Sequence, residues 1–276
     1  MDDGCRRERE GDQSDAGDVR ECHWFFSLFD ALGYVNKMTE ELFKHEPYRA
    51  QAEASVVSTD AGGIVLDRTI FYPRGGGQAG DAGAIVRADG SCIAIADTVK
   101  GEAPGEILHV PVAGQDQALA TLAPGEKVTV AIDWERRHRH MRFHTATHLL
   151  CAIIPHQTNG CSITAGYARL DFDMTEPLDR EHLDREMARL VGEAHDVRTV
   201  WITDEELDAK PELVRTMSVK PPRGVGRVRL LEIDGVDVQP CGGTHVANTR
   251  EIGGIRVAKI EKKSARSRRV VIEFTE

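Results

Sequence analysis

Two short segments, far apart in the chain, each carry a pair of side chains that can bind a metal ion. His144 and His148 belong to the segment His-Thr-Ala-Thr-His. Cys241 and His245 belong to the segment Cys-Gly-Gly-Thr-His. Residues four apart lie on one face of a helix, so both imidazoles of the first pair can reach one point. In the second pair, the glycines let the backbone bend until thiol and imidazole converge. Three imidazole nitrogens and one thiolate suit a tetrahedral Zn²⁺, and such a centre would hold the two segments together.

The residues alone leave the register of the helical pair open. His140, His144 and His148 follow one another at spacings of four, so the pair 140/144 suits a metal as well as the pair 144/148. Histidines at this spacing also occur without a metal, and a cysteine is often a small buried apolar residue. The two motifs together favour a metal site, but their spacing does not choose between the two histidine pairs.

Length and composition are typical of a soluble globular protein with one large or two modest domains. The 276 residues suffice for a sizeable core. No apolar run is long enough to cross a bilayer, and the N-terminus lacks the apolar segment of a secretory signal. Six cysteines without paired spacing indicate a reducing compartment rather than a disulfide framework. The sequence therefore predicts a cytoplasmic protein.

The net charge of −10 is unevenly distributed along the chain. Residues 1–37 carry 5 Lys/Arg and 9 Asp/Glu, whereas residues 215–276 carry 13 Lys/Arg and 7 Asp/Glu. The run EKKSARSRR over 261–269 concentrates positive charge before the last apolar segment. It can neutralise phosphates, or it can be a solvated loop. An acidic protein with one basic face is compatible with a nucleic-acid partner.

Apolar periodicity and turn residues predict how the chain is organised. Residues 1 to about 18 are polar and acidic without periodicity, the apolar stretch 22–32 can form a short helix, and regular patterning begins near Met38, a candidate start of translation. From 54 to 133, short β-type runs alternate with turns containing Gly and Pro. This alternation predicts a small barrel or sandwich.

Helical and strand-like patterns alternate after residue 133. We expect helices over about 134–154, where Pro155 ends the helix, and over 179–196, and another helix beginning near Thr203. Strands are expected over 162–172, 198–202, 225–231, 254–260 and 269–274. An all-β part followed by mixed elements predicts an α+β fold with a boundary near residue 133.

A second motif, FYPRGGGQAGD over 71–81, holds three consecutive glycines. Glycine loses more conformational entropy on folding than any other residue, so the run favours a place where backbone closely approaches a phosphate, a sugar or another segment. A flexible turn between strands is the simpler alternative, but Arg74, Gln78 and Asp81 beside the glycines favour function. The segment is not a P-loop, because no Gly-Lys-Ser/Thr follows. It is not a dinucleotide fingerprint either, because no βαβ unit surrounds it.

The chemistry open to the metal depends on its ligands. The helical motif lacks the Glu that serves as base in His-Glu-x-x-His proteases. Four protein ligands make a closed structural site, so hydrolysis requires one ligand to be distant or displaceable. A zinc-bound water with a lowered pKa can attack an ester carbonyl. The hydroxyl of Thr147 either binds a small polar group of the substrate or hydrogen-bonds back to its own helix.

In this order the motifs resemble the alanyl-tRNA editing family, which comprises the freestanding AlaX proteins and the editing domain of alanyl-tRNA synthetase. The matching segments are LDRTIFYPRGGGQ over 66–78, HTATHLL over 144–150, DVQPCGGTHV over 237–246, TREIG over 249–253 and RRV over 268–270. They span the chain from about Met38 onward, whereas residues 1–37 match nothing in the family. Related threonyl-tRNA synthetase editing domains lack the preceding Gly-rich β domain. Without a further C-terminal extension, the chain resembles the medium-length AlaX class.

The resemblance implies a fold, a cofactor and an activity. The fold would comprise a poorly ordered extension over 1–37, a β-barrel-like domain with the Gly-rich loop over 38–133, and a zinc-binding α+β editing domain over 134–276. The zinc ligands would be His144, His148, Cys241 and His245, which excludes His140. The activity would be trans-editing: a hydrolase that deacylates mischarged tRNA(Ala) without ATP, chiefly Ser-tRNA(Ala), with Gly-tRNA(Ala) as a second candidate substrate.

The resemblance also implies roles for individual residues. Thr147 and Cys241 would take part in catalysis, with Thr147 on the wall that faces serine. Thr164 would be its polar partner, in a segment where the synthetase domain carries a Gln. The loop Gly75, Gly76, Gly77 and Gln78 would hold the terminal adenosine or the ester. The cations expected to bind the tRNA are Arg74, Lys262, Lys263, Arg266, Arg268 and Arg269.

Two other functions agree with the residues. One is a different zinc-dependent hydrolase that acts on small esters or amides without RNA. The other is an RNA-binding module in which the zinc is structural.

An apolar pocket rejects an added hydroxyl poorly, which is why a separate editing site for serine would be useful.

Overall fold

The computed structural model describes residues 38–60, 62–214 and 226–275. Residues 37–276 cluster into one compact unit. The extension predicted over 1–37, with its short helix over 22–32, lies outside the described residues, as does the first residue of the strand predicted over 225–231. No helix within the described ranges is long and apolar enough to cross a membrane.

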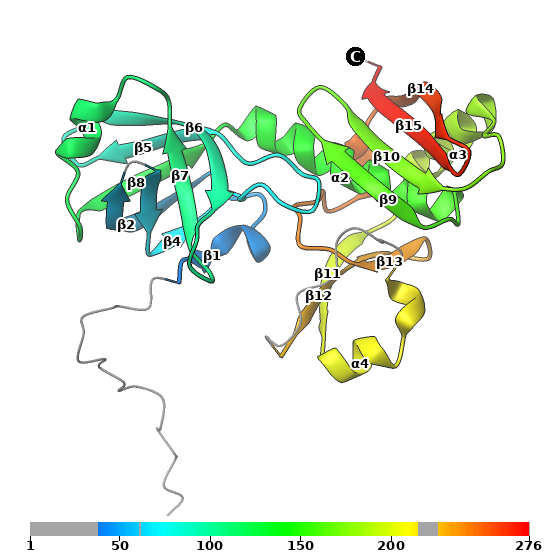
Figure 1. Cartoon of the computed structure of the whole chain (residues 1–276), viewed down its shortest axis with the longest axis horizontal. Helices are drawn as coiled ribbons and strands as arrows, with labels where there is room; N and C mark the ends of the chain where they lie inside the picture. The colour runs from blue at the N-terminus through cyan, green and yellow to red at the C-terminus, as the bar shows by residue number, and fades with distance from the viewer. Residues whose placement is uncertain (1–37, 61, 215–225, 276) are drawn as a thin grey trace, which may run out of the picture. The chain divides into compact units, whose positions relative to one another are not determined.

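A closed antiparallel barrel of six strands forms the first part of this unit (Figure 1). Alternate residues of its longest strand are buried, because successive side chains on a strand point to opposite faces. Apolar side chains fill the interior. Of the two alternatives that the strand pattern left open, a small barrel or a sandwich, the barrel is the one observed. In barrel order the strands are β2 (Gln51–Asp60), β3 (Gly63–Leu66), β7 (Ile107–Pro111), β6 (Cys92–Lys100), β5 (Gly83–Arg87) and β8 (Lys127–Ile132).

Short elements complete this part of the chain. Strand β1 (Glu40–Glu41) pairs in parallel with β4 (Arg68–Thr69), and the 3-10 helix η1 (Leu42–Lys44) follows it. The helix α1 (Asp116–Ala120) lies between β7 and β8 in the chain.

Helix α2 (Trp134–Ile153) follows the last barrel strand and matches the predicted helix closely. The side chain of Asp133 caps its N-terminus by accepting a hydrogen bond from the backbone N–H of Arg136. Every residue from 140 to 151 is buried, although several of them are His or Thr. Polar side chains on a buried helix need hydrogen-bond partners or a metal, so this helix is the natural place for a site.

A four-stranded antiparallel sheet packs against α2 and against α3 (Arg180–Gly192), with a shared apolar core (Figure 1). Its strand order is β14 (Ile255–Ser264), β15 (Ser267–Phe274), β10 (Ala168–Asp173) and β9 (Thr158–Ile163). The single strand predicted over 162–172 is wrong. The hydroxyl of Thr164 accepts hydrogen bonds from the N–H groups of Gly166 and Tyr167, and this local turn divides the segment into a hairpin. Helix α3 is shorter than predicted and is capped by Asp179.

A smaller antiparallel sheet carries the segment that leads into Cys241. It consists of β11 (Val197–Ile202), β12 (Val228–Ile233) and β13 (Asp237–Pro240). Between β11 and β12 lie α4 (Asp204–Asp208), capped by Thr203 as the sequence predicts, and η2 (Pro211–Leu213). The 3-10 helix η3 (Thr249–Ile252) follows the Cys-Gly-Gly-Thr-His loop.

Candidate metal centre

Four side chains from α2 and from the loop after β13 converge on one point. One ligand atom from each of His144, His148, Cys241 and His245 lies within 4.8 Å of all the others. The Sγ atom of Cys241 lies 3.4 Å from Nε2 of His144 and 3.2 Å from Nε2 of His245. Zinc–ligand bonds of about 2.0–2.3 Å give tetrahedron edges of about 3.3–3.8 Å. The group could therefore bind a metal ion.

The competing histidine, His140, lies outside this group. It is fully buried one turn before His144, and neither of its ring nitrogens has a hydrogen-bond partner within the described residues. Burial and the nearby guanidinium groups of Arg136 and Arg137 lower its pKa to about 3. A neutral imidazole is therefore expected at this position.

Buried side chains outside the group orient its three imidazoles. In each ring, Nδ1 lies within hydrogen-bonding distance of a polar atom, which leaves Nε2 for a metal. The partners are Gln78 Oε1 at 2.7 Å from His144, Asp237 Oδ2 at 3.0 Å from His148, and Thr145 Oγ1 at 3.3 Å from His245. All three come from different parts of the chain, so the ring orientations depend on the tertiary fold.

Charges within the group favour a thiolate. Burial raises the pKa of the Cys241 thiol, but the imidazoles of His144 and His245 outweigh this effect and lower the pKa well below its usual value. Burial lowers the pKa of His148, whereas hydrogen bonds with Asp237 and Cys241 raise it, to about 9. Metals bind thiolate and neutral imidazole, so a metal ion would replace the proton that His148 otherwise holds.

Two glycines allow backbone to approach the site closely. A Cβ atom on Gly243 would lie 2.1 Å from Cε1 of His144 and 2.9 Å from Oε1 of Gln78. Gly77 has a φ of 87°, and a Cβ atom there would lie 2.8 Å from Sγ of Cys161. The close approach predicted for the Gly-rich segment is thus made to another segment of the chain, at the end of β9.

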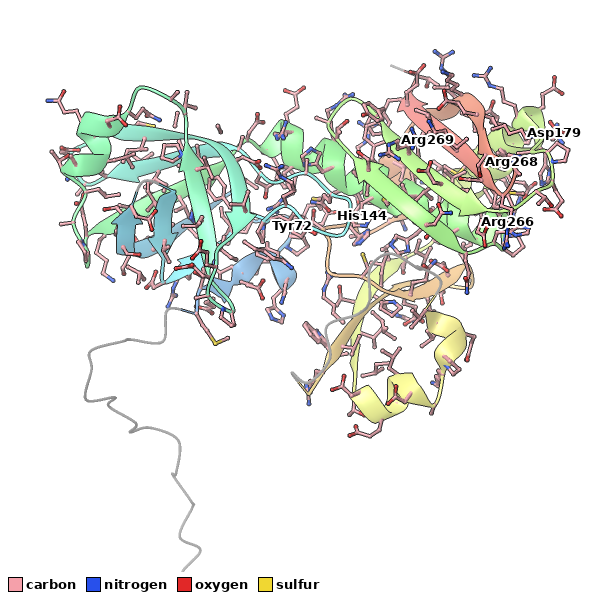
Figure 2. All side chains as sticks on the ribbon, viewed as in Figure 1. Tyr72, His144, Asp179, Arg266, Arg268 and Arg269 are labelled. Atoms are coloured by element: carbon pink, nitrogen blue, oxygen red, sulfur yellow. The ribbon has the colours of Figure 1, made fainter. Side chains whose placement is uncertain are left out.

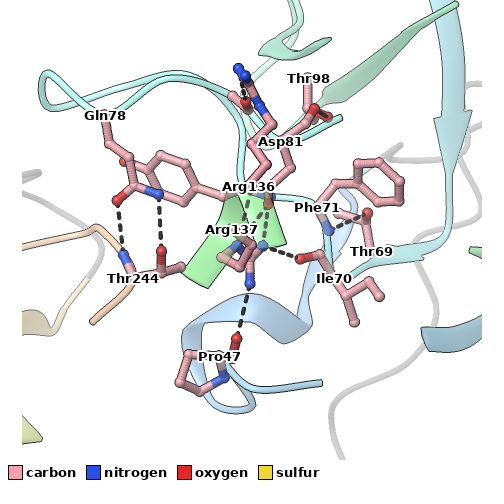
Figure 3. Close-up of polar contacts among 12 residues, drawn as sticks. Pro47, Thr69, Ile70, Phe71, Gln78, Asp81, Thr98, Arg136, Arg137 and Thr244 are labelled. Carbon is pink, nitrogen blue, oxygen red and sulfur yellow. Dashed lines mark hydrogen bonds and ion pairs between the residues drawn. The ribbon is translucent and has the colours of Figure 1, made fainter. Parts of the chain in front are cut away.

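The Gly-rich segment is fastened to helix α2 by a buried ion pair (Figure 3). Arg137 is fully buried and donates to the carboxylate of Asp81 and to the carbonyl oxygens of Ile70, at 2.6 Å, and Pro47, at 3.0 Å. The backbone N–H of Tyr72 donates to the same carboxylate at 2.6 Å. Both ends of the segment are therefore fixed to the helix that carries the two histidines.

Gln78 links this segment to the loop that carries Cys241. It is fully buried, and its Nε2 donates to Oγ1 of Thr244 at 2.9 Å, while its Oε1 accepts from the N–H of Thr244 at 3.1 Å (Figure 3). The same Oε1 also accepts from Nδ1 of His144. The predicted contact of Gln78 with substrate stays a prediction. The observed contacts orient a candidate ligand instead.

Two residues that support the site, Arg229 and Asp237, were assigned no role from the sequence. Arg229 is 7% exposed and donates to the carbonyl oxygens of Cys241, at 2.7 Å, and Gly243, at 2.9 Å. Asp237 orients His148 as described above. Asp237 begins one of the family-like segments, which was the available signal for it. No spacing in the sequence indicates that Arg229 reaches the metal loop.

The two threonines predicted to face the substrate make local hydrogen bonds. Thr147 is buried, and its hydroxyl donates to the carbonyl oxygen of His144 at 2.7 Å, which is the simpler of the two alternatives for this residue. The hydroxyl of Thr164 donates to the carbonyl oxygen of Tyr167 at 2.9 Å and closes the β9–β10 turn. Their substrate contacts stay predictions.

The cations predicted to bind tRNA differ in their surroundings, and Figure 2 labels three of them, Arg266, Arg268 and Arg269. Lys262, Lys263 and Arg266 are exposed on the β14–β15 hairpin. By contrast, Arg268 is buried and donates to backbone carbonyl oxygens, including that of Ser264 at 3.1 Å. Arg269 forms a two-bond ion pair with Asp171 at 2.6 and 2.8 Å, and Arg74 pairs with Asp97.

Known proteins are similar in sequence to this chain over most of its length. A family model described as the threonyl and alanyl tRNA synthetase second additional domain matches residues 228–271. An alanyl-tRNA editing protein AlaX-M from Methanosarcina acetivorans is 35% identical over 243 residues, which cover 84% of this chain and 98% of that protein. The chain belongs to the AlaX family of alanyl-tRNA editing proteins. This confirms the resemblance that the motifs indicate.

Other relatives of this AlaX family member include a second AlaX-M protein and a much longer ligase. An AlaX-M protein from Saccharolobus solfataricus is 35% identical over 238 residues, or 84% of this chain and 98% of that protein. An alanine–tRNA ligase from Metallosphaera sedula is 37% identical over 234 residues, or 81% of this chain but 25% of the ligase. A family model described as tRNA synthetases class II (A) matches residues 6–136. That match extends into residues 1–37, for which the motifs predicted no resemblance.

Proposed function

We propose that this protein is a trans-editing hydrolase that deacylates mischarged tRNA(Ala), chiefly Ser-tRNA(Ala), with Gly-tRNA(Ala) as a second candidate substrate. The observation that carries the proposal is the convergence of three oriented imidazoles and one thiol in a chain that aligns with alanyl-tRNA editing proteins over 84% of its length. The proposed ion is Zn²⁺, because nitrogen and sulfur donors in this ratio suit tetrahedral zinc.

The donor set supports zinc, and its burial suggests the side from which substrate arrives. When bound, Zn²⁺ supplies Lewis acidity that polarises an ester carbonyl. Of the four ligand residues, Cys241 alone is half-buried, while the three histidines are buried. The ester would therefore approach past Cys241, which makes this residue the ligand most exposed to exchange.

Thr147 is proposed to distinguish serine from alanine. Its hydroxyl proton is committed to the carbonyl oxygen of His144, so its remaining lone pairs can only accept a hydrogen bond. The seryl side chain offers such a donor, and the alanyl methyl group does not. A buried polar group left without its partner costs about 1–3 kcal/mol. That difference would favour hydrolysis of the seryl ester.

The exposed cations of the β14–β15 hairpin are proposed to contact the phosphates of the acceptor stem. Among the predicted tRNA contacts on this hairpin, Lys262, Lys263 and Arg266 have exposed side chains, and counterion release on phosphate binding would favour the complex. Arg268 and Arg269 would act through the hairpin, because their guanidinium groups hold it to neighbouring segments.

A deacylation assay on seryl-, glycyl- and alanyl-tRNA(Ala) tests the proposal. We expect release of serine that is lost with a chelator and restored by zinc. Cys241→Ala should abolish release and lower the zinc content, whereas Cys92→Ala, at an exposed cysteine of the barrel, should change neither. Full activity in a zinc-free Cys241→Ala protein would remove the basis for this mechanism.

The same assay separates the two alternative functions. A zinc-dependent hydrolase of small esters or amides would show no salt-sensitive binding of tRNA. An RNA-binding module with a structural zinc would bind tRNA but release no serine.

Selectivity is tested with Thr147→Val, which keeps the shape of the side chain and removes its hydroxyl. We expect faster attack on correctly charged alanyl-tRNA(Ala) relative to seryl-tRNA(Ala). Thr129→Val in barrel strand β8 is the matched control. An unchanged ratio of seryl to alanyl hydrolysis in the Thr147 variant would contradict the recognition role.

A further inference from the structure

A cleft of about 430 Å³ lies beside the candidate metal centre. Its volume falls within the range of about 300–1,000 Å³ that is usual for small-ligand sites. His245 and the two residues after it form one wall, strands β11 and β12 form another, and the segment 44–48 after β1 forms the third. The cleft and the metal group thus share His245.

Aromatic rings line this cleft on two sides. The rings of His45 and Trp201 lie nearly parallel, with 24° between their planes and 5.9 Å between their centroids. Trp201 is half-buried on strand β11, and Tyr48 contributes a third ring. A nucleobase of any sequence can stack on such a surface, because every base has a π-face. The flat purine ring of an adenosine would extend the stack.

Positive charge surrounds the same cleft. Its lining residues include Lys44, Arg198 and Arg229, and none of those within the described ranges is an Asp or Glu. Lys44 pairs with Glu41, which lies outside the lining, in a partly exposed ion pair. Arg198 pairs with Glu232, but its side chain is 61% exposed, and an exposed ion pair of this kind is weak enough to rearrange around a phosphate. Nε of the buried Arg229 has no hydrogen-bond partner within the described residues. The other nitrogens of this guanidinium donate to Thr199, Cys241 and Gly243, so Arg229 contributes positive charge beneath the cleft.

We propose that this cleft, rather than the Gly-rich loop, holds the 3′-terminal nucleoside of the aminoacylated RNA, with its base on Trp201 and its 5′ phosphate near Lys44 and Arg198. Of the two roles that the resemblance implies for the Gly-rich loop, this leaves contact with the ester. This inference rests on the proposed function. The ester to be cleaved is carried by the ribose of the last nucleotide, so that nucleoside must lie next to the metal group. The cleft bounded by His245 combines an aromatic wall, cations and a volume that suit a nucleotide.

Binding of uncharged RNA tests the site without relying on hydrolysis. Two hairpins are compared by fluorescence anisotropy on the zinc-loaded protein: one with a complete single-stranded 3′ end and one that lacks only the terminal adenosine. We expect the intact hairpin to bind about tenfold more tightly, in line with the stacking of one base on an aromatic side chain. Trp201→Ala should remove this difference by weakening only the intact hairpin.

Two further variants control for effects on folding. Trp201→Phe keeps an aromatic face and should retain most of the tenfold difference. Val200→Ala changes the neighbouring exposed residue, whose side chain points to the other face of β11, and should leave both affinities unchanged. In deacylation, Trp201→Ala should raise KM for seryl-tRNA(Ala) more than it lowers kcat.

The outcomes separate this inference from the proposed function. Equal affinity of the wild-type protein for both hairpins would overturn the inference, and so would a Trp201→Ala protein that keeps the wild-type difference, even if serine is released normally. If the wild-type protein releases no serine but loses its preference on Trp201→Ala, the nucleoside site stands and the editing function fails.

Discussion

Replacing Gln78 by Leu separates two roles for the Gly-rich segment. The sequence predicts that Gln78 contacts the substrate, whereas its observed partners are His144 and Thr244. If it orients His144, its loss should weaken zinc binding before any substrate is added. If it contacts substrate, its loss should raise KM and leave zinc affinity unchanged.

The structure sets the size of the expected effect. Gln78→Leu keeps the volume but leaves Nδ1–H of His144 and the N–H of Thr244 buried without an acceptor. Each unmet donor costs about 1–3 kcal/mol of unfolding free energy. Loss of a residue that orients a metal ligand usually lowers metal affinity about 10- to 100-fold. Gln78→Glu retains an acceptor oxygen for both donors, and the hydroxyl of Thr244 can rotate to donate to the second oxygen, so this variant should bind zinc about as tightly as the wild type.

Zinc affinity is measured by competition with a chromophoric chelator, and stability by urea unfolding of the same samples. Gln115→Leu is the matched control, because Gln115 also makes side-chain hydrogen bonds to backbone, at 2.9 and 2.7 Å to Ala94, but within the barrel. It should lose stability and keep its zinc affinity. A wild-type zinc affinity in Gln78→Leu would refute the orienting role and favour a contact between Gln78 and the substrate.

Three further predictions follow from the buried groups. Gly243→Ala should lower zinc affinity more than tenfold, because the new Cβ would meet His144, whereas Gly242→Ala, which meets nothing within 4 Å, should not; chelator competition compares the two. Arg137→Met should cost about 3–5 kcal/mol in urea unfolding by leaving the carboxylate of Asp81 buried and unpaired, and Asp81→Asn in the same protein should recover part of that loss. Burial lowers the pKa of His109 to about 4, so the neutral ring contributes its full stability above pH 6.5, and this stability is lost as pH falls towards 4 because the unfolded chain binds the proton first. Between pH 6.5 and 4, the unfolding free energy of the wild type should fall by up to about 3 kcal/mol more than that of His109→Gln, as measured by urea unfolding at each pH.

Local patterns in the sequence were enough to predict the barrel and helix α2. Strand alternation and Gly- or Pro-containing turns are short-range signals, and so are the cap at Asp133 and the stop at Pro155. The hairpin over 158–173 was missed, because its turn depends on the hydroxyl of Thr164 rather than on a Gly-Pro or Asn-Gly pair. A side-chain cap of this kind interrupts an apolar run without changing its composition.

The choice between His140 and His148 shows what spacing cannot decide. Both lie four residues from His144 on the same helical face. Only the tertiary fold brings Asp237 to 3.0 Å from His148 and leaves His140 without a partner within the described residues. Arg268 illustrates the converse, since a basic residue in a basic run is buried against backbone carbonyls.

The position of Gln78 offers a physical reason for the Gly-rich segment and the paired metal motifs to occur in one chain. The imidazole of His144 needs an acceptor for Nδ1 if Nε2 is to face a metal, and helix α2 does not provide it. The acceptor comes from the segment 71–81, which reaches His144 because Gly77 packs on Cys161 without a Cβ and Gly243 leaves room beside Gln78. The side-chain amide of Gln78 thus connects the Gly-Gly-Gly-Gln loop to the Cys-Gly-Gly-Thr-His loop. A change in either loop that displaces this amide should therefore weaken zinc binding by the same ligand, His144, and paired substitutions at Gln78 and Thr244 should be non-additive in zinc affinity.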